Sequence, residues 1–373
     1  MGHLWLRSEC KKFEMRTPLI PLHAQLLVES GHTVTVEEST QRVFSIEEYR
    51  NAGCSIVPLG AFEFAPQDAY ILGLKHLPES DRLLRHKHIY FAHAFKGQLH
   101  SKQLLRRFKK HDAFLYDLEY LTDHDGKRVV TFGFYAGIVG AAIALMIWAL
   151  KQTGQSAPFT IPNLYMSQSE MLEAIKTLLH SVAVKPSILI IGAQGRSGKG
   201  ACSLIHQLGL DCVEWGREQT ENNDIKREIL AHDILINCVF VDKNTPCFLT
   251  REQLANTEKK LSVISDISCE PESKYNPLPF YTENNSFEHP TQTISGVDLI
   301  SIDNLPSYLP VDSSMHFSEQ LITHLLELLA GDLHNNAWSA AAHSFHQNAT
   351  QKTFYNNQLL PEEELLGMVL SKT

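Results

Sequence analysis

The sequence predicts an α/β protein built from two Rossmann-like, doubly wound domains with a cleft between them. Two regions of the chain each alternate short apolar runs, typical of buried strands, with amphipathic helical patterns. An uncharged apolar run at 129–150 separates the two regions. At 373 residues the chain is long enough for each domain to bury its own core.

The first region has four strand-like runs, at 32–38, 69–75, 88–95 and 113–121. Helical patterns at 18–30, 45–52 and 101–111 lie between them. Thr17 stands before Pro18 as an N-cap residue would, and Ser45 with Glu48 has the spacing of a capping box.

The second region has strand-like runs at 187–193, 212–215, 233–241, 260–268 and 299–302. A closing helix is expected at 318–330, and the tail to Thr373 is expected to pack back on the first domain. We therefore expect one domain formed by 1–133 plus 321–373 and a second formed by 134–320.

The run at 129–150 is long enough to cross a membrane, and Gly133 and Gly137 form a GxxxG pattern. The alternative is a buried helix at the domain junction, where the glycines allow close packing. We favour the buried helix and expect no membrane association, because the sequence has no second span and a single span would separate the glycine turn from the candidate catalytic residues described below.

The segment SILIIGAQGRSGKGA at 187–201 predicts a strand that turns into a helix around a pyrophosphate. Its glycines, Gly192, Gly195 and Gly198, allow close approach of the backbone, and the helix N-terminus offers free N–H groups to the anion. A glycine turn without a ligand has a similar pattern. Lys199 is followed by Gly200 rather than Ser or Thr, so the pattern favours a dinucleotide over ATP or GTP.

Composition excludes some classes of protein. The net charge of −9 is spread out, without a basic stripe, which argues against nucleic acid as a partner. The seven cysteines form no CxxC pair, and we see no N-terminal signal sequence, so we expect a reducing cytoplasm. The histidines at 86, 88, 93, 100 and 111 match no ligand spacing, and we expect no metal site.

Polar residues at the ends of strands are the first candidates for chemistry, because ligands of open α/β sheets bind beyond the carboxyl ends. Lys75 ends one strand-like run, and His93 lies near the end of the next, followed by Lys96 and Gln98. We expect all four at one edge of the first sheet.

Carboxylates and arginines complete this predicted site. Glu119 lies inside an apolar strand, with Asp117 expected on the same face, and such buried acids need partners. Arg16 and Arg128 carry forked donors suited to carboxylates. With Lys75 and Lys96 these arginines form a cluster of four cations, whose field is expected to lower the pKa of Lys75 and to attract an anionic ligand.

Segments spread along the chain carry a resemblance to one enzyme family. They are LRSECKKFEMRTPLIP, GLKHLPE, HIYFAHAFKGQ, LYDLEYL, GKRVVTFGFYAG, the glycine turn and SIDNLPSYLP. In this order they resemble the single-function, lysine-forming saccharopine dehydrogenases, from about Leu4 to Leu329. The resemblance implies Rossmann-like domains related to the alanine dehydrogenase and transhydrogenase group. It also implies oxidation of saccharopine to L-lysine and 2-oxoglutarate with NAD.

The resemblance also implies residue roles. Lys75 matches the base that takes the proton of the secondary amine, His93 the acid/base that activates water, and Glu119 an acid that tunes the pair. Substrate is expected at the domain 1–133 plus 321–373, on Arg16, Lys96, Gln98, Arg128 and Phe132. The dinucleotide is expected at 134–320, on Gly192, Gly195, Arg196, Ser197, Gly198, Arg217, Phe240, Ile302, Asp303, Asn304 and Leu305.

The sequence departs from the family at three points. His76 stands where the family has a glutamate after the catalytic lysine. Arg217 and Glu218 stand where an acid is expected to bind the ribose, which suggests some use of NADP, although Glu218 is an alternative replacement for that acid. Ser197 replaces a cysteine of the glycine turn, so Cys238 lacks the disulfide partner that it has in the family.

The sequence is also compatible with other functions. An opine-type or carboxyalkyl-polyamine dehydrogenase, or an alanine dehydrogenase relative, would use the same mechanism on another small amino-acid substrate. A non-catalytic dinucleotide sensor would keep the fold alone, but Lys75, His93, Glu119 and Arg128 together argue against it. We expect a monomer or a small homo-oligomer.

Overall fold

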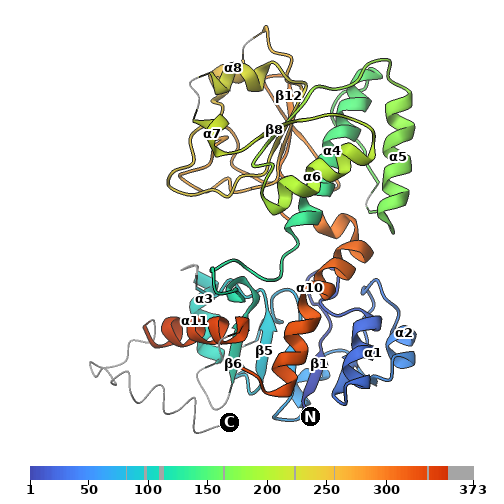
Figure 1. Cartoon of the computed structure of the whole chain (residues 1–373), viewed down its shortest axis with the longest axis vertical. Coiled ribbons are helices and arrows are strands. Elements are labelled where there is room, and N and C mark those ends of the chain that lie inside the picture. Colours follow the sequence, from blue (N-terminus) through green and yellow to red (C-terminus); the bar gives the residue numbers. More distant parts are fainter. Residues whose placement is uncertain are drawn as a thin grey trace.

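The computed structural model describes residues 1–80, 82–95, 99–108, 113–162, 164–221, 224–255, 257–333 and 336–351. Within these residues the chain forms two six-stranded sheets, one in each of two lobes (Figure 1). The segment that leads into helix α4 and the long helix α10 join the lobes. The predicted fold class, two Rossmann-like α/β domains, is confirmed.

The first sheet has the strand order β3-β2-β1-β4-β5-β6 and is parallel throughout. Its strands are β1 (His3–Leu6), β2 (Thr33–Glu37), β3 (Ser55–Val57), β4 (Tyr70–Leu72), β5 (Lys87–Tyr90) and β6 (Phe114–Asp117). The sequence analysis missed β1 and β3, although β1 is central, because runs of three or four residues are too short to show a period. Because every strand pair is parallel, all carboxyl ends lie at one edge of the sheet, as expected for the candidate site.

Five helices of the described chain accompany this sheet. They are α1 (Pro21–Glu29), α2 (Ile46–Asn51), α3 (Leu99–Arg107), the second half of α10 (Pro310–Ala330), and α11 (Ala337–Gln351). The capping box of Ser45 and Glu48 is confirmed. The predicted start of α1 was wrong, because Ile20 is the N-cap and the backbone N–H of Ile20 donates to the Ser318 hydroxyl of α10.

The C-terminal elements return to the first sheet. Helix α10 starts before the predicted 318–330 and buries Phe317, Leu321 and Leu325 in the core of the first lobe. Trp338 of α11 packs edge-on against Tyr116 of β6, at 5.4 Å between ring centroids. The remainder of the tail, 352–373, lies outside the described residues.

The second sheet has the order β11-β12-β10-β9-β7-β8. Its strands are β7 (Ile188–Ile191), β8 (Val213–Trp215), β9 (Ile234–Asn237), β10 (Val263–Asp266), β11 (Gln292–Ile294) and β12 (Val297–Ile300). Its helices are α4 (Gly133–Gln152), α5 (Gln168–His180), α6 (Arg196–Gln207), α7 (Arg217–Thr220), α8 (Ile225–Leu230) and α9 (Arg251–Leu254). The antiparallel edge strand β11 was not predicted.

Helix α4 forms the centre of the second core. By length and composition it could cross a membrane, but 72% of its most apolar window is buried, which confirms the predicted buried helix. Gly137 and Gly200 let α4 touch α6: a Cβ on Gly137 would lie 1.8 Å from the Ser197 carbonyl oxygen, and one on Gly200 1.9 Å from that of Phe134. The glycine turn at the start of α6 is therefore fixed beside the start of α4.

We predict that Gly137→Ala destabilises the protein by about 1–3 kcal/mol or more, because the new methyl group would overlap backbone that cannot rotate away. Urea denaturation measures the free energy of unfolding. Gly133→Ala, in the first turn of the same helix, is the control, since its Cβ would meet only atoms at 3.4 Å or beyond. Equal stability of the two variants would contradict the packing described.

Candidate active site

Lys75 follows β4 at the carboxyl edge of the first sheet, and a buried ion pair holds its backbone. Glu9 accepts hydrogen bonds from the N–H groups of Leu74 and Lys75, at 2.7 and 2.9 Å, and the Arg7 guanidinium donates to the Lys75 carbonyl. Arg7 and Glu9 are paired at 3.5 Å. Gly73 leaves room for this guanidinium, because a Cβ would lie 2.4 Å from the guanidinium carbon of Arg7.

The side chain of Lys75 is poised to act as a base near neutral pH. Burial lowers its pKa to about 8, and the charge of Arg16 acts in the same direction, while Glu14 and Asp303 oppose it. The predicted lowering is confirmed, but its main cause is burial rather than a field of four cations. Lys96, one of those cations, and Gln98 lie outside the described residues.

Arg16 is buried and links three parts of the site. Its Nε and Nη2 donate to both carboxylate oxygens of Glu14, at 2.8 and 2.7 Å, and Nη2 also donates to Oδ1 of Asn304, at 2.7 Å. Its guanidinium carbon lies 4.3 Å from the ring centroid of Phe132. The structure thus brings together Arg16, Phe132 and Asn304, which the sequence analysis assigned to substrate and coenzyme.

Glu14, like Arg7 and Glu9, is a site residue that was not predicted from the sequence. Its pKa is lowered despite its burial, because the adjacent Arg16 favours the charged carboxylate. The signal was available in the sequence, since an acid two residues before an arginine in a short segment can form this pair. The expectation that the cations need an external anion is corrected: Arg16 and Arg128 each already contact a carboxylate, Glu14 and Glu119 respectively.

His93 follows β5 and shares Glu119 with Arg128. Its Nδ1 lies 3.4 Å from Oε1 of Glu119, and Nη1 of Arg128 lies 3.1 Å from Oε2 of the same carboxylate. The imidazole stacks on Phe91 at 6.4 Å, and the His76 ring lies at the same distance. The predicted grouping of His93, Glu119 and Arg128 therefore holds in the structure.

Glu119 lies not in a strand, as predicted, but in the 3-10 turn Leu118–Tyr120 that follows β6. Asp117, the last residue of β6, does not point with it toward the cations. Its Oδ1 instead accepts hydrogen bonds from the N–H groups of Ala92 and Glu119, at 3.2 and 3.1 Å, and its Oδ2 accepts one from Ala94, at 3.3 Å. The cations are thus not the partners of Asp117, because backbone N–H groups satisfy it.

The Asp117 carboxylate holds the loop that carries His93. His93 has a φ of +48°, in the left-handed region that a residue with a side chain rarely adopts, so the loop needs external support. Burial raises the pKa of Asp117 to about 6, although the three backbone N–H donors favour its charged form. Asp117 therefore acts on the backbone that orients His93 and Glu119.

The glycine turn has three features that are typical of pyrophosphate-binding turns. Gly192 has a φ of +80°, and a Cβ on Gly198 would lie 2.2 Å from the Gly192 carbonyl oxygen. Gly195 is the N-cap of α6 and offers no capping side chain, so the first N–H groups of the helix face outward. Residues of this chain therefore fit a dinucleotide at this turn.

Both sides of the predicted site meet at the domain junction. Arg196, in the first turn of α6, donates to the backbone carbonyl of Arg128. Ser197 lies beside the start of α4: its Oγ would be 3.4 Å from a Cβ on Gly133. The segment after β12 reaches the substrate side through Asn304 and through the charge of Asp303 near Lys75.

Other predicted coenzyme residues differ in exposure. Ile302 and Leu305 are 4% and 2% exposed and belong to the core of the second lobe, so they position the segment by packing. Phe240 is 83% exposed, and Arg217 is also exposed. The structure brings neither of these two residues into a contact that assigns it to the coenzyme.

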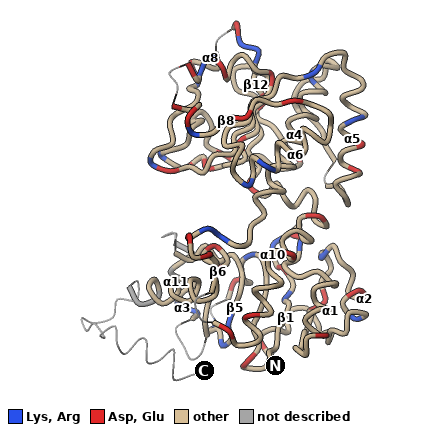
Figure 2. Tube along the Cα trace, viewed as in Figure 1, with Lys and Arg blue, Asp and Glu red and all other residues tan. Residues whose placement is uncertain are grey.

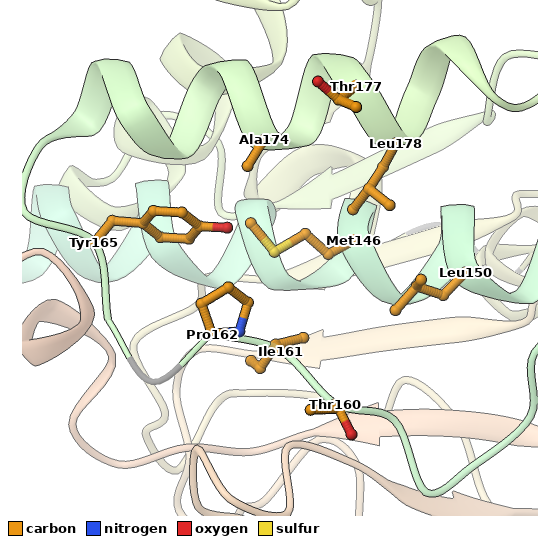
Figure 3. Close-up of a pocket in the computed structure, with 9 residues that line it drawn as sticks. All are labelled: Met146, Leu150, Thr160, Ile161, Pro162, Tyr165, Ala174, Thr177 and Leu178. Carbon is orange, nitrogen blue, oxygen red and sulfur yellow. The ribbon is translucent and has the colours of Figure 1, made fainter.

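A separate groove of about 360 Å³ lies between α4, α5 and the segment that joins them (Figure 3). Met146, Leu150, Ile161, Pro162 and Leu178 give it a mostly apolar lining. It contains no predicted site residue and lies at the C-terminal half of α4, whereas the glycine turn packs at the N-terminal half.

Family models match most of the chain. The N-terminal domain of alanine dehydrogenase/PNT matches residues 5–139, and the C-terminal domain of the same family matches residues 127–353. A solved L-alanine dehydrogenase superposes with a TM-score of 0.64 at 17% identity, over 98% of this chain and 99% of that chain. A transhydrogenase from Sinorhizobium meliloti gives a TM-score of 0.62 at 14% identity, over 88% and 94% of the two chains. These structures share the fold.

Curated relatives are more similar in sequence. The saccharopine dehydrogenase (NAD+, L-lysine-forming) of Schizosaccharomyces pombe is 39% identical over 341 residues, which cover 87% of this chain and 93% of that protein. The enzyme of the same name from Candida glabrata is 41% identical over 339 residues, covering 87% and 91%. With its fold and its predicted catalytic residues gathered at one edge, the chain belongs to the NAD+-dependent, L-lysine-forming saccharopine dehydrogenase family.

Proposed function

We propose that this protein oxidises saccharopine to L-lysine and 2-oxoglutarate, reversibly, with NAD+. The observation that carries the proposal is Lys75, an amine with a pKa of about 8, next to the Arg16–Glu14 pair and the charge of Asp303. A buried amine in this range suits proton transfer with a secondary amine near neutral pH. The names of the curated relatives support the same reaction and the same coenzyme.

The proposed mechanism assigns each group one task. The dinucleotide, held at the glycine turn, supplies a hydride acceptor. Lys75 takes the proton of the secondary amine as the adjacent C–H bond gives up its hydride, which leaves an imine. Arg16 and Arg128 bind the carboxylates of the substrate, and in exchange their contacts with Glu14 and Glu119 loosen.

His93 carries out the second half of the reaction. The Glu119 carboxylate lies at its Nδ1, which favours the proton on that nitrogen and makes Nε2 the basic nitrogen. Nε2 takes a proton from water as the water adds to the imine, and the protonated Lys75 returns its proton to the imine nitrogen. When the carbinolamine breaks down, His93 gives its proton to the departing amine nitrogen, and Lys75 takes the proton of the hydroxyl group, which becomes the carbonyl of 2-oxoglutarate. Lysine and 2-oxoglutarate are then released.

An assay with purified protein tests the function. Lysine, ornithine or a polyamine is combined with 2-oxoglutarate or pyruvate, and oxidation of NADH is followed by its ultraviolet absorbance. Of these combinations, we expect NADH oxidation only with lysine and 2-oxoglutarate. Turnover that prefers another amine or oxo acid would favour the opine-type alternative, and no turnover with any pair would favour a dinucleotide sensor.

We predict that Lys75→Met lowers kcat for saccharopine oxidation by roughly 10²–10⁴-fold, because the variant has no proton acceptor at this position. In the parent enzyme, kcat/KM should rise with pH up to about 8, since the amine of Lys75 accepts a proton only when it is neutral. Lys87→Met is the control, because Lys87 begins β5 at the opposite edge of the sheet. Unchanged kcat in Lys75→Met would overturn its role as base.

We predict that Asp117→Asn lowers kcat by about 10- to 100-fold while KM for NAD+ stays within about twofold. The amide can still accept at Oδ1, but its NH₂ group would face the Ala94 N–H, and a lost charge-assisted hydrogen bond costs about 1.5–3 kcal/mol. The change should act on the His93 loop and not on the coenzyme turn.

Asp233→Asn provides the matched control for this variant. Asp233 accepts hydrogen bonds from the backbone N–H and the hydroxyl of Ser187. The two residues precede β9 and β7, at the amino-terminal ends of the strands of the second sheet. The Asp233→Asn substitution should lower the free energy of unfolding without lowering kcat. An equal loss of kcat in both variants, in proportion to stability, would show that Asp117 has only a structural role.

We predict measurable activity with NADP+ as well as with NAD+. Arg217 is exposed just after β8, where it can bind the 2′-phosphate of NADP+. Arg217→Ala should lower kcat/KM for NADP+ by about tenfold or more and leave that for NAD+ nearly unchanged. Arg227→Ala, exposed on α8, is the control. A strong NAD+ bias in the parent enzyme would contradict this prediction.

We place the enzyme in lysine biosynthesis, in the cytoplasm, as a monomer or small homo-oligomer that does not bind membranes or nucleic acid. Acidic and basic positions are interspersed over both lobes, which supports the absence of nucleic-acid binding (Figure 2). Light scattering after size exclusion tests the oligomeric state.

A further inference from the structure

A cluster of metal-binding side chains lies in the second domain, away from the residues proposed for catalysis. It consists of Cys202, Cys212 and Glu214, whose two sulfur atoms and one carboxylate oxygen all lie within 4.8 Å of one another. Among the residues that the structure describes, it is the one such group of three. It was not predicted from the sequence, because neither the histidine spacings nor the absence of a CxxC pair pointed to it.

The fold brings these three residues together from two elements. Cys202 lies on α6, while Cys212 comes directly before β8 and Glu214 lies within it. Cys212 and Glu214 are two positions apart along an extended segment, so their side chains leave the same face. Since α6 connects β7 to β8 and packs on the sheet, Cys202 meets that face.

The donor set suits a soft divalent ion. Two thiolates at ~2.3 Å from a tetrahedral Zn²⁺ lie roughly 3.8 Å apart, which is within the spacing of this cluster. Thiolate ligands select zinc over Mg²⁺ or Ca²⁺, and the carboxylate adds a third ligand. Cys202 is buried, Cys212 is half-buried and Glu214 is exposed, which gives an ion a route from solvent and leaves room for water as a fourth ligand.

We propose that Cys202, Cys212 and Glu214 form a binding site for one Zn²⁺ ion. The ion would connect α6 to β8 at a point that bears on the coenzyme site. Strand β8 ends at Trp215, whose carbonyl accepts hydrogen bonds from the N–H groups of Gly192 and Ala193, at 2.8 and 3.2 Å. A bound ion therefore stabilises the pair of elements that shape the glycine turn, without taking part in the reaction.

The test uses full-length, metal-free protein kept reduced by a phosphine. Isothermal calorimetry with Zn²⁺ should give one site, and Co²⁺ should produce the intense thiolate-to-cobalt absorption that only sulfur ligands give. Cys212→Ser should abolish both signals, and Glu214→Gln should weaken Zn²⁺ binding by tenfold or more. Cys247→Ser is the control, because Cys247 is a free cysteine outside the cluster.

Thermal unfolding gives a second readout. Zn²⁺ should raise the Tm of the parent protein and of Cys247→Ser but not of Cys212→Ser. Because Cys212 is only half-buried, its serine variant should fold, and binding of NADH to that variant checks this.

Three outcomes would overturn the proposal. One is Zn²⁺ binding that survives in Cys212→Ser, which would place the ion elsewhere, for example on the imidazoles of the active site. Another is the absence of sulfur-to-cobalt absorption in the parent protein. The third is the loss of two titratable thiols on mild oxidation combined with no metal binding, which would identify the pair as a disulfide-forming dithiol.

Discussion

The burial of charge at the carboxyl edge of the first sheet is the constraint on which the site depends. A buried cation is costly unless a carboxylate lies next to it, and the structure meets this requirement with Glu9 for Arg7 and Glu14 for Arg16. Arg128 is more exposed and pairs with Glu119. Lys75, by contrast, lies among charges of both signs and is largely buried, so its pKa falls to about 8. The same charges thus stabilise the fold and prepare an anion site.

Carboxylates also hold the backbone that carries the proposed catalytic groups. Glu9 accepts the N–H groups of Leu74 and Lys75, and Asp117 accepts those of Ala92 and Ala94 on either side of His93. Each clamp lies at the end of a strand, where the ladder of sheet hydrogen bonds stops and backbone donors would otherwise lack partners. The lysine and the histidine are therefore supported by equivalent devices on neighbouring loops.

Contact between α4 and α6 connects this edge to the coenzyme domain. Gly137 and Gly200 allow the two backbones to touch, which brings Arg196 to the Arg128 carbonyl. Asn304 approaches from the segment after β12 and accepts from Arg16. Groups far apart in the sequence thus meet at one junction, where a hydride acceptor held by one domain can face a substrate held by the other.

The sequence by itself predicted the two α/β domains, the glycine turn and the buried helix, and it singled out Lys75, His93 and Glu119 as candidate catalytic residues, because periodicity, glycine spacing and motif order are local signals. Only the tertiary structure decided which charges meet. Glu14 pairs with Arg16, Asp117 binds backbone rather than cations, and the central strand β1 was too short to recognise. These outcomes depend on which strands become neighbours, and that pairing is settled by the packing of the whole chain.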